Sequence, residues 1–125
     1  MERRRLTGQL GERVALAYLL DRGFREVRRN YRCTLGELDL VMLDGDTLVF
    51  VEVRTRRGAG GVRPEESVDA QKQKQLAKLA HHYLQSEGGW SGPWRVDVVA
   101  VTLGREASVE QVVHIEHAVE DADGW

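Results

Sequence analysis

The stretch GELDLVMLDGDTLVFVEVR, residues 36–54, decides the fold of this chain. Two runs of strand-forming apolar residues flank the turn sequence Asp44-Gly45-Asp46. An Asp-Gly step between two such runs is a strong hairpin signal, so the runs are predicted to pair antiparallel. Each run also carries an acid, Asp39 in the first and Glu52 in the second. An acid inside an apolar strand is costly unless a cation or a hydrogen-bond donor binds it, so both residues are candidates for a binding site.

The turn determines how these two acids lie relative to each other. A two-residue turn at Gly45-Asp46 sets Asp39 opposite Glu52, whereas a turn at Asp44-Gly45 sets it diagonally across, opposite Phe50. Both registers place the acids on one face of the hairpin, and an unbulged three-residue loop would separate them. Directly opposed residues have Cβ atoms about 4.5–5.5 Å apart, so two carboxylates there can share one divalent ion. Without a cation their repulsion would raise the pKa of one of them, so the spacing indicates a metal site.

Length, cysteine content and hydropathy limit the class of protein. The 125 residues suffice for one domain with one core, predicted to span 1–119, with a frayed acidic tail at 120–125. The lone Cys33 cannot form an intramolecular disulfide, and no Cys/His cluster suits zinc. No stretch approaches the length of a membrane span, and the N-terminus has no apolar signal region. We therefore expect a soluble, cytoplasmic protein without a membrane partner.

Hydrophobic periodicity and turn signals predict an alternation of helices and strands. One helix, over 7–22, is capped by Thr7, and a second helix is opened by Pro64 and ended by Gly88-Gly89. The predicted strands cover 25–32, 36–43, 47–55, 95–101 and, at an edge of the sheet, 109–117. This order implies an α/β or α+β sandwich with a mixed sheet.

Glu12, in the first predicted helix, is a third acid that faces inward. At about 100° per residue it falls between Leu16 and Leu19, on an apolar stripe rather than on a solvent face. Glu12 is therefore expected to face the interior of the protein.

Basic residues concentrate in two parts of the chain, although the formal net charge is only −2. Arginines crowd the N-terminal third, and a second basic cluster begins at the end of the second hairpin strand (47–55) and continues along the polar face of the second helix. If the two clusters converge, they form a positive surface beside the acids, as binding of a phosphate backbone requires. The candidates for nucleic-acid binding are Arg56, Arg57, Gln71, Lys72, Lys74 and Lys78. Solvated charges scattered over the surface explain the same pattern equally well.

The three acids also have a plainer explanation. Glu52 and Arg54 share one face of a strand and can form an ordinary ion pair. Asp39 can cap a turn or pair with Arg32, and Glu12 can pair with a neighbouring arginine. All of these interactions would persist without a metal.

The other polar residues are expected to have structural roles. Asp97 is predicted to pair with Arg95 or with a backbone donor rather than to bind metal. Neighbouring histidines on a helix diverge, and His114 and His117 point to opposite faces of a strand. We therefore expect these histidines, together with the pair at 81–82, to be surface residues.

Four motifs in this order resemble a known family. They are Gly8-x-x-Gly11-Glu12, the run 36–41, the run 51–56 (VEVRTR) and Arg95-x-Asp97-Val98-Val99. Over about residues 7–103 the chain is similar to the YraN-like family of bacterial proteins. It also resembles the PD-(D/E)XK nuclease superfamily, which includes restriction endonucleases and archaeal Holliday-junction resolvases. The resemblance implies a restriction-endonuclease-like α/β sandwich, with a mixed central sheet of about five strands flanked by two main helices.

The resemblance also implies an activity and assigns residues to it. Asp39 and Glu52 would hold Mg²⁺ or Mn²⁺, with Glu12 completing the set and the Val53 carbonyl as a further ligand. Together with Arg54, the three acids would form the catalytic group for hydrolysis of phosphodiester bonds. Arg54 stands where the superfamily usually has Lys. A guanidinium cannot accept a proton from water, although it can neutralise a phosphate.

The expected partner is nucleic acid, DNA rather than RNA. By analogy with the resolvases, the DNA would be branched or otherwise structured and the protein a homodimer. Two other functions stay open. The first is a non-catalytic nucleic-acid binding module with a degenerate nuclease site, and the second is a protein-interaction scaffold without salt-dependent affinity for nucleic acid.

Overall fold

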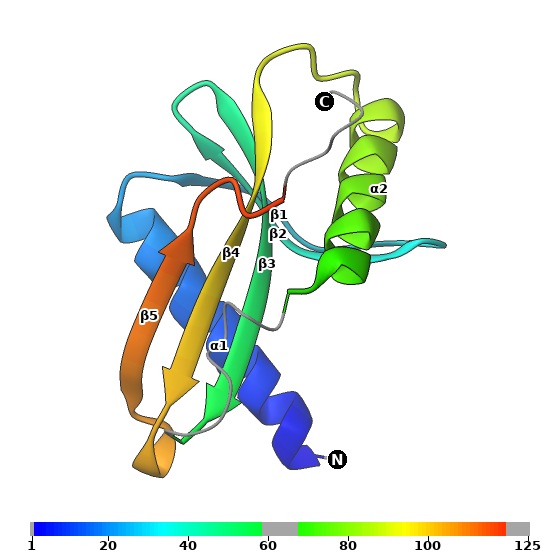
Figure 1. Cartoon of the computed structure of the whole chain (residues 1–125). Helices are drawn as coiled ribbons and strands as arrows, with labels where there is room; N and C mark the ends of the chain where they lie inside the picture. Colours follow the sequence, from blue (N-terminus) through cyan, green and yellow to red (C-terminus); the bar gives the residue numbers. More distant parts are fainter. Residues whose placement is uncertain (1, 59–67, 120–125) are drawn as a thin grey trace.

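The computed structural model describes residues 2–58 and 68–119 and shows a mixed sheet with a long helix on each face (Figure 1). The elements in chain order are α1 (Glu2–Asp21), β1 (Arg25–Cys33), β2 (Gly36–Asp44), β3 (Thr47–Arg57), α2 (Ala70–Ser86), β4 (Trp94–Leu103), a short 3₁₀ turn (Arg105–Ala107) and β5 (Val109–Ile115). The strands lie in the order β1-β2-β3-β4-β5, with β3 and β4 parallel and the other pairs antiparallel. The predicted α/β class is confirmed, and the arrangement is consistent with a restriction-endonuclease-like fold.

The β2–β3 hairpin has the register that a turn at Gly45-Asp46 produces. Its pairs run from Asp44↔Thr47 to Leu40↔Val51. Gly45 lies in the left-handed region at φ +62°, which glycine adopts without steric cost. The backbone pairing stops at Leu40 and Val51, so the next residues outward on the two strands are Asp39 and Glu52.

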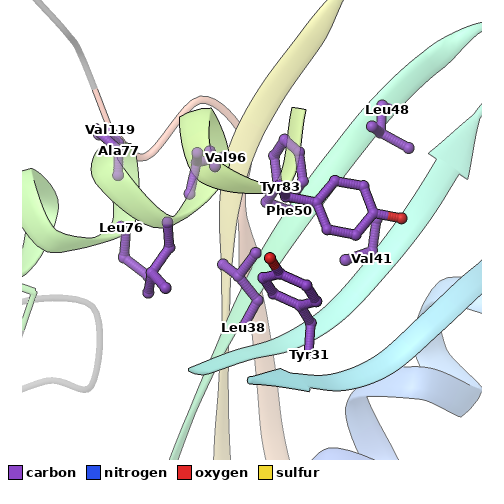
Figure 2. Close-up of a cluster of buried hydrophobic side chains, with 12 residues drawn as sticks. Tyr31, Leu38, Val41, Leu48, Phe50, Leu76, Ala77, Tyr83, Val96 and Val119 are labelled. Atoms are coloured by element: carbon purple, nitrogen blue, oxygen red, sulfur yellow. The ribbon is translucent and has the colours of Figure 1, made fainter. Parts of the chain in front are cut away.

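Two separate cores fill the space between the sheet and the two helices. β3 alternates between them, because Leu48 and Phe50 belong to the α2 side whereas Val49 and Val51 belong to the α1 side. On the α2 side the Tyr83 and Phe50 rings pack edge to face, with Leu76 and Val96 nearby (Figure 2). By the same alternation Glu52 projects toward α2.

The parallel pairing of β3 with β4 requires a crossover, and α2 forms it. The helix begins at Ala70, with Asp69 as its N-cap, so the predicted start at Pro64 is wrong. The Asp69 backbone is extended and its carboxylate accepts a 2.9 Å hydrogen bond from the Lys72 amide, which satisfies one of the free donors of the first turn. Pro64 itself lies outside the described residues.

Helix α1 begins at Glu2, five residues before the predicted cap at Thr7. Thr7 instead lies inside the helix, where its Oγ1 accepts a 2.7 Å hydrogen bond from Nε of Arg57 on β3. The helix ends as predicted before Gly23, which has φ +94°. The predicted frayed tail at 120–125 lies outside the described residues. In the part of the chain that is described, no helix combines the length and the apolar character that crossing a membrane requires.

Candidate functional site

Asp39 and Glu52 form an acidic pair at the point where the β2–β3 ladder ends. Oδ2 of Asp39 accepts a 2.8 Å hydrogen bond from the Val53 amide, which has no β2 carbonyl opposite it in the ladder. The hairpin register sets Asp39 opposite Glu52, and the charge of Glu52 acts on Asp39 strongly enough to raise its pKa. Glu52 is buried, with 5% of its surface exposed, and Asp39 is half-buried. The structure therefore brings the two predicted acids into direct contact.

Burial, and after it the neighbouring negative charges, favour the protonated form of Asp39. Burial raises the pKa of Asp39 to about 8, and the negative charges of Glu52 and Glu12 act in the same direction against the hydrogen bond from Val53. Two carboxylates held this closely repel each other when both are ionised, and a nearby positive charge reduces that repulsion. A divalent cation can take the place of the Asp39 proton, so the chemistry of this pair suits cation binding.

Glu12 approaches the pair from α1, which lies directly against β3. A Cβ at Gly11 would collide with Oγ1 of Thr55, so only glycine permits this approach of the helix to the strand. Burial raises the pKa of Glu12, and the charges of Glu37 and, to a smaller extent, Glu52 add to the rise. Glu12 is thus an electrostatic neighbour of the pair, as its inward-facing position in the sequence predicted.

Glu37 and Asn30 extend the site beyond the residues that the sequence singled out. With its amide in the orientation that satisfies both partners, Asn30 donates to Oε1 of Glu12 at 3.2 Å and to Oε1 of Glu37 at 3.0 Å. Glu37 lies two residues before Asp39, so the two-residue period of a strand could have identified it. Nothing in the sequence marks Asn30, whose φ of +52° is a conformation that asparagine tolerates well.

Two cations meet on one oxygen of Glu52. Nη1 of Arg54 and Nζ of Lys72 both lie 3.3 Å from Oε2. The same-face ion pair of Glu52 with Arg54 is therefore confirmed. Lys72, which was expected only to bind nucleic acid, comes from the first turn of α2 and contacts the acidic pair directly.

The alternative partners of Asp39 are wrong. The partner of Arg32 is Glu37, with Nε 3.7 Å from Oε1, rather than Asp39. Asp39 contacts the Val53 amide and Glu52 instead. The Val53 carbonyl stays a predicted ligand.

The predicted nucleic-acid residues form two surfaces rather than one. Lys72, Lys74, Lys78 and Gln71 line a hollow of about 600 Å³ beside α2. Arg57 instead lines a groove of about 540 Å³ beside α1, together with arginines 13 and 29. The two helices cover opposite faces of the sheet, so these basic clusters do not converge into a single patch. Arg56, half-buried on β3, is not among the residues that line either depression.

A separate polar cluster surrounds the fully buried Asp97 on β4. The Asp97 carboxylate accepts hydrogen bonds from Nε of Arg95 at 2.9 Å, from the His117 amide at 3.1 Å and from Nε2 of His114 at 2.8 Å. The predicted pairing of Asp97 is confirmed. The surface assignment of His114 is wrong, because β5 turns its ring inward against the rings of Tyr18 and Phe24.

The donor set of the acidic pair fits a metal that keeps part of its water shell. Among residues 2–58 and 68–119, no group of three His, Cys, Asp or Glu side chains is arranged to hold an ion by itself. Mg²⁺ commonly binds through one or two carboxylates and retains several waters, and Mn²⁺ accepts the same oxygen ligands. Asp39 and Glu52 supply two such carboxylates, with Glu12 close enough to add charge.

Comparisons with known proteins identify relatives over most of the chain. The model of the uncharacterised protein family UPF0102 matches residues 11–101, which include Glu12, Asp39, Glu52 and Asp97. A UPF0102 protein of Moorella thermoacetica is 48% identical over 92% of this chain and 96% of its own. Another, from Stutzerimonas stutzeri, is 51% identical over 81% of this chain and 85% of its own.

One solved structure shows a weak similarity. It is the structure of Pyrococcus furiosus SfsA in complex with Ca²⁺, with a TM-score of 0.35 and 15% identity. The match covers 94% of this chain and 65% of SfsA, so this chain spans less than two thirds of that protein. A similarity this low carries no argument about function.

Proposed function

This chain belongs to the uncharacterised protein family UPF0102, and we propose that it is a metal-dependent nuclease that hydrolyses phosphodiester bonds in DNA. The observation that carries the proposal is the contact between Asp39 and Glu52 in a partly buried site. A pair of this kind is unfavourable unless a proton or a cation neutralises it, and active sites are where such perturbed carboxyl groups concentrate.

The residues of the site have distinct roles in this reaction. Asp39 and Glu52 would hold Mg²⁺ or Mn²⁺, and Glu12 would add negative charge from α1. The bound ion would polarise the phosphodiester and lower the pKa of a water that attacks it. The Val53 amide fixes the direction of the Asp39 carboxylate, and Arg54 holds Glu52 in place.

The basic surfaces on either side of the acidic pair support nucleic acid as the substrate. Lys72, Lys74 and Lys78 beside α2 suit a chain of phosphates, which bind lysine as a point charge. The similarity to resolvases extends the proposal to branched or structured DNA, to a homodimeric assembly and to action in the cytoplasm. The cleavage assay described next distinguishes DNA from RNA as the substrate.

The test is a cleavage assay with labelled duplex DNA, four-way junctions, single-stranded DNA and RNA in Mg²⁺ or Mn²⁺. Cleavage by the native chain is expected to disappear in Asp39→Ala and Glu52→Ala. The matched control is Asp46→Ala, an exposed acid of the same hairpin, which should cleave normally. Cleavage that persists in both site variants would show that another site or a contaminant is responsible and would overturn the proposal.

A second candidate is a nucleic-acid binding module with a degenerate site. The observation that favours this module is that two basic side chains, Arg54 and Lys72, already pair with Glu52. Arg54 also stands at the position where the superfamily usually has lysine. This module would bind DNA with a strong dependence on salt but would not cleave it in any metal. A scaffold that acts only on proteins would show no salt-dependent DNA affinity at all.

A further inference from the structure

Lys72 connects the acidic pair to the basic hollow beside α2. Its ammonium lies 3.3 Å from Oε2 of Glu52, and the same side chain lines the hollow that contains Lys74 and Lys78. Arg54 reaches the same oxygen but is not among the described residues that line that hollow. A phosphate chain lying along the lysines would therefore meet Lys72 immediately before it meets the carboxylates.

The position of Lys72 is fixed by contacts on three sides. Its amide is bound by the capping carboxylate of Asp69 at 2.9 Å, which sets the start of the helix. Its ammonium donates to Oε1 of Gln75 at 3.4 Å, and Gln75 in turn donates to the carbonyl of Leu35, also at 3.4 Å. Leu35 lies in the β1–β2 turn, which reaches the first turns of α2 (Figure 1).

The burial of the three lysines also differs. The side chain of Lys72 is 27% exposed, whereas Lys74 and Lys78 are exposed residues on the same helix. A lysine that is drawn toward buried acids gives up hydration, and its charge acts more strongly there than at the open surface. The environment of Lys72 is therefore that of a site residue rather than of a solvated binding residue.

From these contacts we propose that Lys72 is a catalytic residue of the nuclease reaction. Its ammonium binds the non-bridging oxygens of the scissile phosphate and stabilises the negative charge that develops there. Arg54 is then a positioning residue that keeps Glu52 in place. The proposal rests on the nuclease function, and it names the α2 hollow as the path by which the DNA strand reaches the acids.

The test compares Lys72→Met with Lys74→Met, because methionine keeps the apolar stem and removes the charge in both. In single-turnover assays with saturating Mn²⁺ and DNA, Lys72→Met should slow cleavage about 100-fold. Its Kd for DNA should rise less than about threefold. This is a smaller rise than we expect from the loss of one phosphate contact at low salt. Lys74→Met should show the opposite split, with weaker binding and a much smaller change in rate. Arg105→Met, an exposed cation before β5, is the control for loss of charge alone.

A second measurement does not depend on activity. Without DNA, Lys72 opposes a cation at Glu52, so Lys72→Met should bind Mn²⁺ at least about threefold more tightly in a calorimetric titration. Lys74→Met should match the native chain. Lys72→Gln, which keeps a polar group toward Glu52 and Gln75, repeats the experiment if the methionine variant unfolds.

The outcomes separate this proposal from the proposed function. Normal cleavage by Lys72→Met, or a loss confined to its DNA affinity, would overturn the catalytic assignment and leave the nuclease intact. If the native chain cleaves no substrate, the nuclease proposal fails and the catalytic role of Lys72 fails with it. Tighter Mn²⁺ binding by Lys72→Met would then still support the inference that Lys72 lies beside a cation site at Glu52. An unchanged Mn²⁺ affinity would overturn that inference as well.

Discussion

The Val53 amide donates its hydrogen bond to the side chain of Asp39 instead of to a backbone carbonyl of β2. The bond spans 2.8 Å at the first position beyond the Leu40–Val51 pair, where the two strands no longer pair through their backbones. A main-chain donor thus fixes the carboxylate next to Glu52 before any ligand arrives. For the proposed nuclease reaction this preorganisation is an advantage, because a group that is already in place does not have to be reoriented during the reaction.

Asp39→Asn should change how stability depends on pH. The folded pKa of Asp39 is raised from its ordinary value to about 8, so the folded state binds more protons than the unfolded chain between these values. The native free energy of unfolding should therefore fall as the pH rises from about 6 to about 8.5, and the fall should be shallower in Asp39→Asn. Urea denaturation at the two pH values measures this. Asp46→Asn, in the exposed turn, should behave like the native chain.

Mg²⁺ should offset that loss by replacing the proton on the pair. At about pH 8.5, millimolar Mg²⁺ should raise the melting temperature of the native chain and leave Asp39→Asn nearly unchanged. An equal rise in both proteins would show that the ion binds elsewhere.

Arg54→Lys tests whether the arginine limits the chemistry. Since Lys72 already brings an ammonium to Glu52, we expect the single-turnover cleavage rate to change less than about threefold. A gain of more than about tenfold would instead show that Arg54 impairs the site and would favour the degenerate module. DNA affinity, measured in parallel, keeps effects on binding apart from effects on rate.

The sequence predicted the acidic pair because the relevant distances are local. Asp39 and Glu52 lie on two strands joined by a two-residue turn, so alternation along each strand and one choice of register place them together. The inward direction of Glu12 followed in the same way from the period of its helix.

What the sequence missed depends on contacts between distant segments. The place of Lys72 follows from where the crossover sets the first turn of α2 relative to β3, and no local period encodes that distance. His114 is buried because β5 pairs with β4 and turns the ring toward Tyr18 and Phe24. The predicted first residues of the two helices are also wrong, because residue type specifies the exact end of a helix only weakly.

Gly11→Ala should destabilise the protein although alanine favours helices. The new Cβ would collide with Thr55 and push α1 away from β3, at a cost of about 1–3 kcal/mol. Gly8→Ala is the matched control, because nothing lies within 4 Å of a Cβ there and the helix should gain up to about 1 kcal/mol. Chemical denaturation measures both. Equal effects of the two changes would show that α1 does not press on Thr55.

Asp97→Asn should cost about 3 kcal/mol at neutral pH, because Arg95 loses its buried anion. Although burial alone would raise it, hydrogen bonds from His114, Arg95 and the His117 amide hold the pKa of Asp97 below its usual range. A lowered pKa contributes stability above the unfolded value, and that stability is lost as the pH falls through the folded value. The gap between native and variant proteins should therefore narrow below about pH 4.

Urea denaturation of both proteins across this pH range measures the gap. Asp21→Asn, an exposed acid at the end of α1, should differ from the native chain by less than about 0.5 kcal/mol throughout. A gap that stays constant with pH would mean that the loss comes from packing rather than from the charge of Asp97.

The length of the two-residue turn at Gly45-Asp46 sets the register of residues that lie far from the turn. One extra residue there would shift the register by a single step, and every side chain of β3 would change faces. Glu52 would then point at α1, Phe50 would leave the core beneath Tyr83, and the carboxyl pair would be broken without any change to its own residues. The spacing of this hairpin is therefore as much a part of the site as the acids themselves, and family members that carry insertions at this turn should have lost both the pair and whatever it binds.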